Sequence, residues 1–242
     1  MIGKSLIARE NEILETLETL YPKREKFTLI GGYAVNAYSV LPRYSVDCDL
    51  VVPKDESENL AIFFKESGYQ DQGTLHSNEL EGLETRRFVK PVGGDNVSVD
   101  LMINGIRCRQ TGAVWNEREI RESSKDIRVL GVNRSVPSRA ASRELLIAMK
   151  LHSGRDTDLR DVVMLAESAD WSLVASNSNK GLLDKVISQL LGAIKKMVEP
   201  NFEDRLKSSF GKKSVERARV AATLTGINQV LKEIRQISSK EG

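Results

Sequence analysis

The stretch from residue 27 to residue 52, FTLIGGYAVNAYSVLPRYSVDCDLVV, is the part of the chain that most constrains its fold. It reads as a buried strand, a Gly-Gly turn, a helix, a short connection with one arginine, and a second strand that opens with Asp47-Cys48-Asp49. Side chains two positions apart on a strand share a face, so Asp47 and Asp49 point the same way. This order of elements predicts a sheet covered by helices.

The two neighbouring carboxylates indicate a cation site. Like charges on one face repel each other, and a chain that places them there usually supplies a compensating cation. Oxygen ligands select a hard divalent ion, and Mg²⁺ accepts two carboxylates together with substrate phosphates. Gly31 and Gly32 bring bare backbone N–H groups to a place where a phosphate chain could lie. Taken separately, a Gly-Gly pair is also an ordinary turn, and Asp-x-Asp is also a solvated strand end.

A third carboxylate comes from a later strand. Residues 96–103, NVSVDLMI, alternate like a half-buried strand and follow a turn after the strand predicted over 85–90. An acid in the middle of a strand is costly without a partner. We therefore expect Asp100 to share the metal of Asp47 and Asp49.

These motifs together resemble a known superfamily. Gly31-Gly32, the segment Arg43-Tyr44-Ser45-Val46-Asp47-Cys48-Asp49-Leu50 and the lone Asp100 are similar to the nucleotidyltransferases of the DNA polymerase beta type. Within that superfamily the chain resembles the AbiEii-like branch, the toxin-type nucleotidyltransferases of abortive-infection systems. Two later motifs of that branch have counterparts here: Lys150 in RELLIAMKLHSGR, and Asp158 with Asp161 in RDTDLRDVVMLAE. The resemblance spans roughly residues 27–167.

The resemblance implies a transfer of a nucleoside monophosphate from an NTP to an acceptor, with release of pyrophosphate. Asp47, Asp49 and Asp100 would hold Mg²⁺ or Mn²⁺, and Asp100 would also help to deprotonate the acceptor hydroxyl. The nucleotide would be bound by residues of three segments, namely Gly31, Gly32, Arg43, Ser45, Asp158 and Asp161. Lys150 would bind substrate phosphate and be held by an ion pair with Asp161. Without the resemblance, Lys150 reads as a lysine that extends from an amphipathic helix to solvent.

Composition supports an α+β protein of two parts. The chain has 242 residues, of which 40% are apolar, and we expect a nucleotidyltransferase-like mixed β-sheet flanked by helices over 1–135 and a C-terminal helical bundle over 136–242. Cys48 and Cys108 have no Cys or His at metal-ligand spacing, which predicts reduced thiols in a cytoplasmic protein. The charged N-terminus and the lack of a long apolar run predict neither signal peptide nor membrane contact.

Weaker local patterns predict the remaining elements. We expect helices over 5–20 and 57–67, a strand fragment and loop over 69–83, a short helix over 111–119, a strand over 127–132 and a helix from about Ser138. Arg86 and Arg87 point to opposite faces of their strand, so at most one of them can face the acids. The last helix, over about 213–237, is basic but interleaved with acids, which favours a solvated face over a patch for RNA.

The acceptor and the protein partners follow from the resemblance alone. The toxin-type relatives imply RNA, and tRNA in particular, as one acceptor class, and an antitoxin as a partner protein. The net charge of +2 gives the chain no overall field that would attract nucleic acid. The alternative function is a catalytically inactive nucleotide-binding or protein- or RNA-interaction module of the same fold.

Overall fold

The computed structural model of this chain describes residues 2–39, 43–45, 47–78, 82–210 and 217–241. Contacts divide the chain into two compact units. The first comprises Met1–Ile106 with Trp115–Ser142, and the second comprises Arg107–Val114 with Arg143–Gly242.

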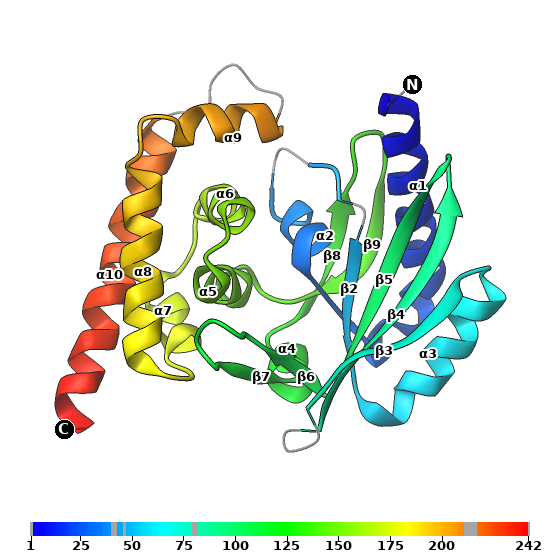
Figure 1. Ribbon diagram of the computed structural model, residues 1–242, viewed down its shortest axis with the longest axis horizontal. Helices are drawn as coiled ribbons and strands as arrows, with labels where there is room; N and C mark the ends of the chain where they lie inside the picture. The colour runs from blue at the N-terminus through cyan, green and yellow to red at the C-terminus, as the bar shows by residue number, and fades with distance from the viewer. Residues whose placement is uncertain (1, 40–42, 46, 79–81, 211–216, 242) are drawn as a thin grey trace. The chain divides into compact units, whose positions relative to one another are not determined.

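The first unit is built on a mixed sheet of seven strands (Figure 1). The strand order is β3-β4-β5-β2-β1-β9-β8, in which β2 with β5 and β1 with β9 are parallel and the other neighbours are antiparallel. The strands are β1 Thr28–Ile30, β2 Asp47–Val52, β3 Gln70–Asn78, β4 Leu83–Val92, β5 Asp95–Ile103, β8 Lys125–Leu130 and β9 Ser135–Ala140. The predicted α+β class with a mixed sheet is confirmed.

Helices α1 (Ile2–Leu20) and α3 (Lys54–Glu66) cover one face of this sheet. On that face the rings of Phe64 and Phe88 lie 5.3 Å apart between their centroids, and both side chains are fully buried. Loss of either ring would cost about 3 to 5 kcal/mol. The short helix α2 (Gly31–Asn36) follows β1 directly, and the 3₁₀ helix η1 (Tyr21–Lys26) joins α1 to β1.

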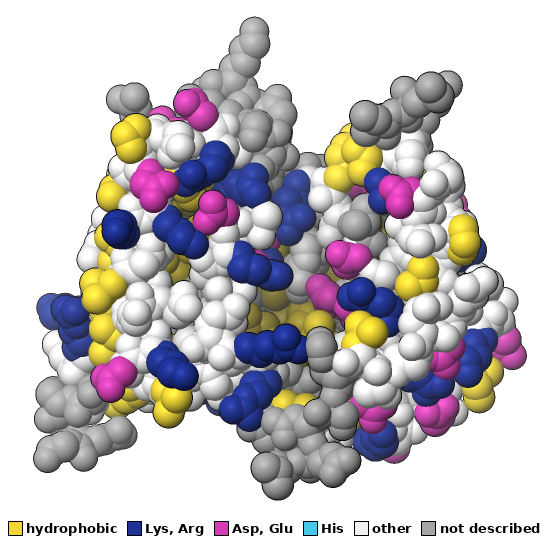
Figure 2. Space-filling view, in the orientation of Figure 1, with side chains coloured by type: hydrophobic (Ala, Val, Ile, Leu, Met, Phe, Trp, Pro, Cys, Tyr) yellow, Lys and Arg dark blue, Asp and Glu magenta, His cyan; other side chains and the backbone are white. Residues whose placement is uncertain are grey.

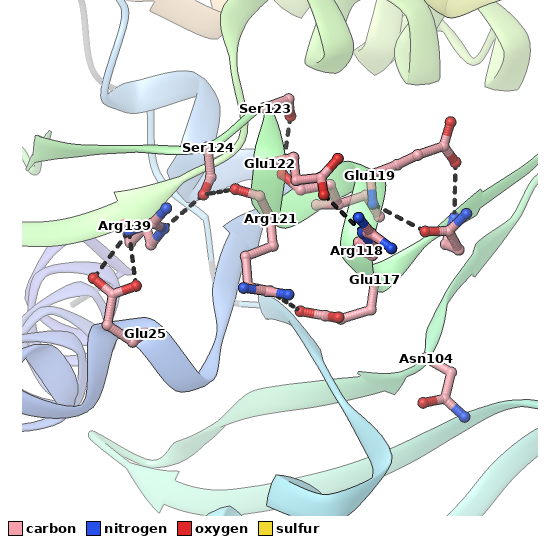
Figure 3. Close-up of polar contacts among 12 residues, drawn as sticks. Glu25, Asn104, Glu117, Arg118, Glu119, Arg121, Glu122, Ser123, Ser124 and Arg139 are labelled. Carbon is pink, nitrogen blue, oxygen red and sulfur yellow. Dashed lines mark hydrogen bonds and ion pairs between the residues drawn. The ribbon is translucent and has the colours of Figure 1, made fainter.

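The prediction of a single short helix over 111–119 is wrong. Residues Val114–Asn116 form β7, which pairs with β6 (Gly105–Arg107) in a separate two-stranded sheet, and the helix α4 spans Glu117–Glu122. Asn116 and Glu119 form a reciprocal capping box at the start of α4 (Figure 3). This box fixes the helix start after Trp115, which is buried on the strand instead.

Polar contacts hold α4 and its surroundings at the surface of the unit (Figure 3). Arg118 pairs with Glu122 and Arg121 with Glu117, each pair one helical turn apart. Residues four apart on a helix are neighbours on its surface, so pairs of this spacing support the helix. They secure a helix of only six residues, which is too short to be stable alone.

The sequence-based prediction misses one strand and makes another too short. The predicted helix start near Ser138 is wrong, because residues Ser135–Ala140 form β9 and the next helix begins at Arg143. Pro137 gives the segment the appearance of a crossover, but β1 pairs with β9 at Leu29 and Ala140, three residues beyond the proline. Strand β3 is longer than the predicted fragment, and register shifts along it interrupt the alternation that would reveal a strand.

The second unit is helical, as predicted for the C-terminal part. Its helices are α5 Arg143–Ser153, α6 Asp156–Leu165, α7 Trp171–Ser178, α8 Leu183–Met197, α9 Phe202–Phe210 and α10 Arg217–Glu241. Helix α10 packs on α7 and α8, and α5 packs on α6 and α7. Gly226 of α10 lies directly against the indole of Trp171, because a Cβ at that position would come within 1.9 Å of the ring.

The surface of the protein carries both signs of charge. Lys and Arg side chains are interspersed with Asp and Glu on the face shown in Figure 2. Among the helices that the structure describes, none has the length and apolar character needed to cross a bilayer.

Candidate functional site

The predicted acidic residues of the first unit lie on one face of two neighbouring strands, β2 and β5. Asp49 on β2 is the direct neighbour of Asp100 on β5, and Asp100 is in turn the direct neighbour of Arg87 on β4. Directly opposed residues of paired strands share a face, so these three side chains form a row across the sheet. Asp47 lies on the same face two positions before Asp49, opposite Ser98. We call Asp47, Asp49 and Asp100 the carboxylate row.

The glycine turn lies against this row. Gly31 adopts a φ of +68°, and a Cβ built there would come within 1.9 Å of Asp49 Oδ2. Glycine is the residue that permits both the left-handed backbone and such a close approach. The sequence predicted Gly31 and Asp49 separately as parts of a site, and the structure brings them into contact.

The second glycine lies against the side chains of Arg43 and Ser45. A Cβ at Gly32 would come within 2.6 Å of Ser45 Oγ and 3.1 Å of Arg43 Nη2. Ser45 and Arg43 therefore both lie over the start of α2. Of the predicted phosphate-binding residues, the structure gathers Gly31, Gly32, Arg43 and Ser45 around one turn.

Two buried side chains hold the backbone of Arg43 and Ser45 in place. The sequence reading did not single out either of them. The Asn36 side chain donates to the carbonyl oxygen of Arg43 at 2.8 Å and accepts from the Arg43 N–H at 3.1 Å. The Tyr33 hydroxyl donates to the carbonyl oxygen of Ser45 at 2.7 Å. Asn36 is fully buried on an otherwise apolar helix, and a buried amide of this kind needs partners, which was the available signal.

Arg87 is a further residue of the site, and it pairs with Asp100. Its Nε donates to Oδ1 and its Nη2 to Oδ2, both at 2.7 Å. The hydrogen bond to Asp100 raises the pKa of Arg87 against the opposing effect of burial, and the charges of Asp47 and Asp49 add to this rise. The guanidinium therefore lies in the field of the whole carboxylate row.

The prediction that at most one of the two neighbouring arginines faces the acids is confirmed. Arg86 points to the opposite face, where its guanidinium pairs with Asp71 and with Glu58 of α3. The hydrogen bond from Arg86 is the main reason that the pKa of Asp71 is lowered. Arg86 belongs to the packing of α3 on the sheet, whereas Arg87 belongs to the site.

The donor set of the row has the chemistry that a divalent cation requires. Three carboxylates on one face supply the hard oxygen ligands that Mg²⁺ and Mn²⁺ prefer. At present Asp47 Oδ1 accepts from the Ser98 hydroxyl at 2.6 Å, and both oxygens of Asp100 accept from Arg87. Within the described ranges, no three His, Cys, Asp or Glu side chains are gathered closely enough to hold a metal ion.

Cys48 lies between the acids in sequence but on the other face of β2. It is the direct neighbour of Val99 and is buried in the core. Burial raises its pKa well above the ordinary value, and the charges of Asp49, Asp100 and Asp47 raise it further. Cys48 is therefore a core side chain, on the face of β2 opposite to that of the acids.

The helical unit contains the remaining predicted site residues. Lys150 of α5 is 9% exposed, and its Nζ lies 2.9 Å from Asp158 Oδ1 and 2.7 Å from Asp161 Oδ2 on α6. The ion pair expected between Lys150 and Asp161 is therefore present, and the reading of Lys150 as a solvent-reaching lysine is wrong. Burial opposes the charged form of Lys150, but the two carboxylates outweigh it and raise its pKa.

Asp158 pairs with a second cation as well as with Lys150. It accepts from Arg155, whose Nε lies 2.6 Å from Oδ2. Burial raises the pKa of Asp158, but Lys150 and Arg155 prevail and lower it to about 2. The nearby His152 is a buried core residue that contacts Thr111 and Ser178, and burial lowers its pKa to about 4.

The sequence matches the family described as the nucleotidyl transferase AbiEii toxin of type IV toxin-antitoxin systems over residues 12–229. No curated protein matches it significantly. A structure described as a candidate nucleotidyltransferase from H. pylori is 16% identical, with a TM-score of 0.49 over 97% of each chain. JHP933 from Helicobacter pylori is 14% identical, with a TM-score of 0.48 over 96% of this chain and 94% of that chain.

Proposed function

Since the chain belongs to the AbiEii nucleotidyltransferase toxin family, we propose that it transfers a nucleoside monophosphate from an NTP to an acceptor hydroxyl and releases pyrophosphate. The observation that carries this proposal is the carboxylate row beside the glycine turn. Asp49 lies both next to Asp100 and against the backbone of Gly31. Metal-ligating oxygens and the bare backbone of a glycine turn are thus combined at one point of the sheet.

Asp47, Asp49 and Asp100 are the residues that would hold Mg²⁺ or Mn²⁺. Such an ion, when bound, neutralises the triphosphate and stabilises the oxygens that attack and leave in an in-line displacement. Asp100 is the group that would accept the proton of the acceptor hydroxyl. Arg43 and Ser45 lie over Gly32, where they would donate to the phosphates and orient them.

We assign Lys150 to phosphate binding as well. An ammonium group has three donors, and the carboxylates of Asp158 and Asp161 account for two of them. Their charges keep the lysine protonated and hold its Nζ in one place. A fixed, charged donor neutralises developing charge without reorganising during the reaction.

The acceptor and the partner protein are also part of what we propose. RNA is the acceptor class that we favour, because the resemblance to the toxin-type nucleotidyltransferases implies it; the family description itself names no acceptor. The same family description implies an antitoxin as the partner protein. The interspersed surface charges (Figure 2) favour recognition of such partners by local contacts rather than by a general field.

A specific observation favours a second candidate function. Both oxygens of Asp100 are engaged by Arg87, and the described residues do not gather three metal-ligating side chains. A nucleotide-binding module without turnover would have this arrangement permanently. It would bind NTPs without a divalent ion and would transfer nothing.

A transfer assay distinguishes the two functions. The protein is incubated with each α-³²P-labelled NTP, Mg²⁺ or Mn²⁺ and total RNA, and both labelled RNA and released pyrophosphate are measured. We expect labelling by the wild type and a loss of at least about a hundredfold in Asp100→Asn. Asp95→Asn is the matched control, because Asp95 lies on the same strand with its side chain 59% exposed. Nucleotide binding without labelling of any acceptor would favour the inactive module.

A further inference from the structure

Arg87 engages the carboxylate that the proposed reaction assigns to a metal ion. The two residues are direct cross-strand neighbours, and the guanidinium fork donates one N–H to each oxygen of Asp100 at 2.7 Å. The Asp100 side chain is 9% exposed, whereas that of Arg87 is 38% exposed. Asp100 is thus nearly buried, while the arginine that pairs with it is partly open to solvent.

The positive charge of Arg87 opposes the binding of a divalent cation at Asp100. Arg87 feels the attraction of all three acids of the carboxylate row, so it partly neutralises them when no metal is bound. An ion of charge +2 on the same carboxylates would lie close to the guanidinium and would be repelled by it. It would also compete for the oxygens that the fork now occupies.

We propose that Arg87 is a positioning residue that competes with the divalent cation for Asp100. It holds the Asp100 carboxylate in place in the resting protein and releases at least one of its two bonds when the cation binds. This inference rests on the proposed function for the identity of the ligand. The exposure of the arginine side chain allows the guanidinium to turn toward solvent when the carboxylate is taken.

The neighbouring arginine provides a matched control. Arg86 lies on the same strand, makes ion pairs of the same kind with Asp71 and Glu58, and points to the opposite face. A pair with a merely structural role would stabilise the sheet and leave cation binding unchanged. Arg86→Gln is therefore expected to lower the thermal stability without altering the affinity for a divalent ion.

The test is direct binding of Mn²⁺ alone, followed by the electron paramagnetic resonance signal of the free ion. We expect Arg87→Gln to bind Mn²⁺ about tenfold more tightly than the wild type, because the guanidinium fork no longer occupies the oxygens of Asp100 and a unit positive charge beside the ion is removed. Arg86→Gln should bind like the wild type. Adding Asp100→Asn to Arg87→Gln should abolish the gain, since the released carboxylate is its source.

The outcomes separate this inference from the function on which it rests. Equal or weaker binding by Arg87→Gln, with binding by the wild type intact, would overturn the role of Arg87 and leave the metal site standing. Binding by neither protein would overturn both. If Arg87→Gln folds poorly, Arg87→Lys keeps the charge but loses the fork, and it should bind Mn²⁺ more tightly than the wild type. An unchanged affinity in Arg87→Lys would then overturn the inference.

Discussion

The contact between Gly31 and Asp49 gives a sharp prediction for Gly31→Ala. The new Cβ would come within 1.9 Å of Asp49 Oδ2 at a backbone φ of +68°. The left-handed backbone costs about 1 to 2 kcal/mol for an alanine, and displacing the carboxylate adds about 1 to 3 kcal/mol of overpacking. We therefore expect a loss of about 2 to 5 kcal/mol in the free energy of unfolding, together with loss of nucleotide binding in the presence of Mg²⁺.

Gly94→Ala is the control for the backbone part of this effect. Gly94 has a φ of +84° with no atom within 4 Å of its Cβ position, so an alanine there meets the same backbone cost but no side chain. Urea denaturation of both variants gives the difference that the Asp49 contact contributes. If Gly31→Ala were no less stable than Gly94→Ala and still bound nucleotide with Mg²⁺, the close packing of turn and carboxylate would not matter.

Further predictions concern packing, pH and the segment that carries Arg43. Gly226→Ala should destabilise the helical unit by about 1 to 3 kcal/mol, because its Cβ meets the indole of Trp171. Gly192→Ala, with open space around it on α8, should stabilise the unit by about 0.5 to 1 kcal/mol. Equal Tm values for the two variants would refute the contact with Trp171. The pKa of Asp158 is lowered to about 2, so its charged form contributes roughly 2 kcal/mol to the free energy of unfolding. This contribution is complete above pH 4 to 5 and is lost as the pH falls toward 2. Asp158→Asn should flatten that part of the acid denaturation curve, and an unchanged curve would contradict the lowered pKa. Asn36→Ala should raise the KM for NTP several-fold, because the two hydrogen bonds that hold the backbone of Arg43 are lost. A loss of stability with an unchanged KM would show that Asn36 serves folding alone.

The parts of the fold that the sequence predicted correctly are those with strong local signals. Strand β2 begins at Asp47, where the acidic pair was placed, and β5 contains the alternating run around Asp100. Helices α1 and α3 follow from amphipathic spacing. Strand β9 was missed because its residues are small or polar, and its extended backbone is set by pairing with strands far away in the sequence.

The candidate site shows the same division between local and non-local information. Alternation along a strand placed Arg86 and Arg87 on opposite faces, but it could not tell which of them faces Asp100. That choice depends on the register of β4 with β5, which the structure supplies. The role of Asn36 was also hidden, because its partner is the backbone of Arg43, and a contact of this kind is set by the fold and not by a pattern in the sequence.

Calorimetric titration with each of the four ribonucleoside triphosphates, with and without Mg²⁺, tests the central claim most directly. The wild type is compared with an Asp47→Asn, Asp49→Asn variant, in which the proposed metal ligands lose their charge while the strand keeps its shape. We predict binding that depends on Mg²⁺ and disappears in the variant. Binding of equal strength in both proteins, or in the absence of any divalent ion, would contradict the assignment of the carboxylate row as a metal-nucleotide site.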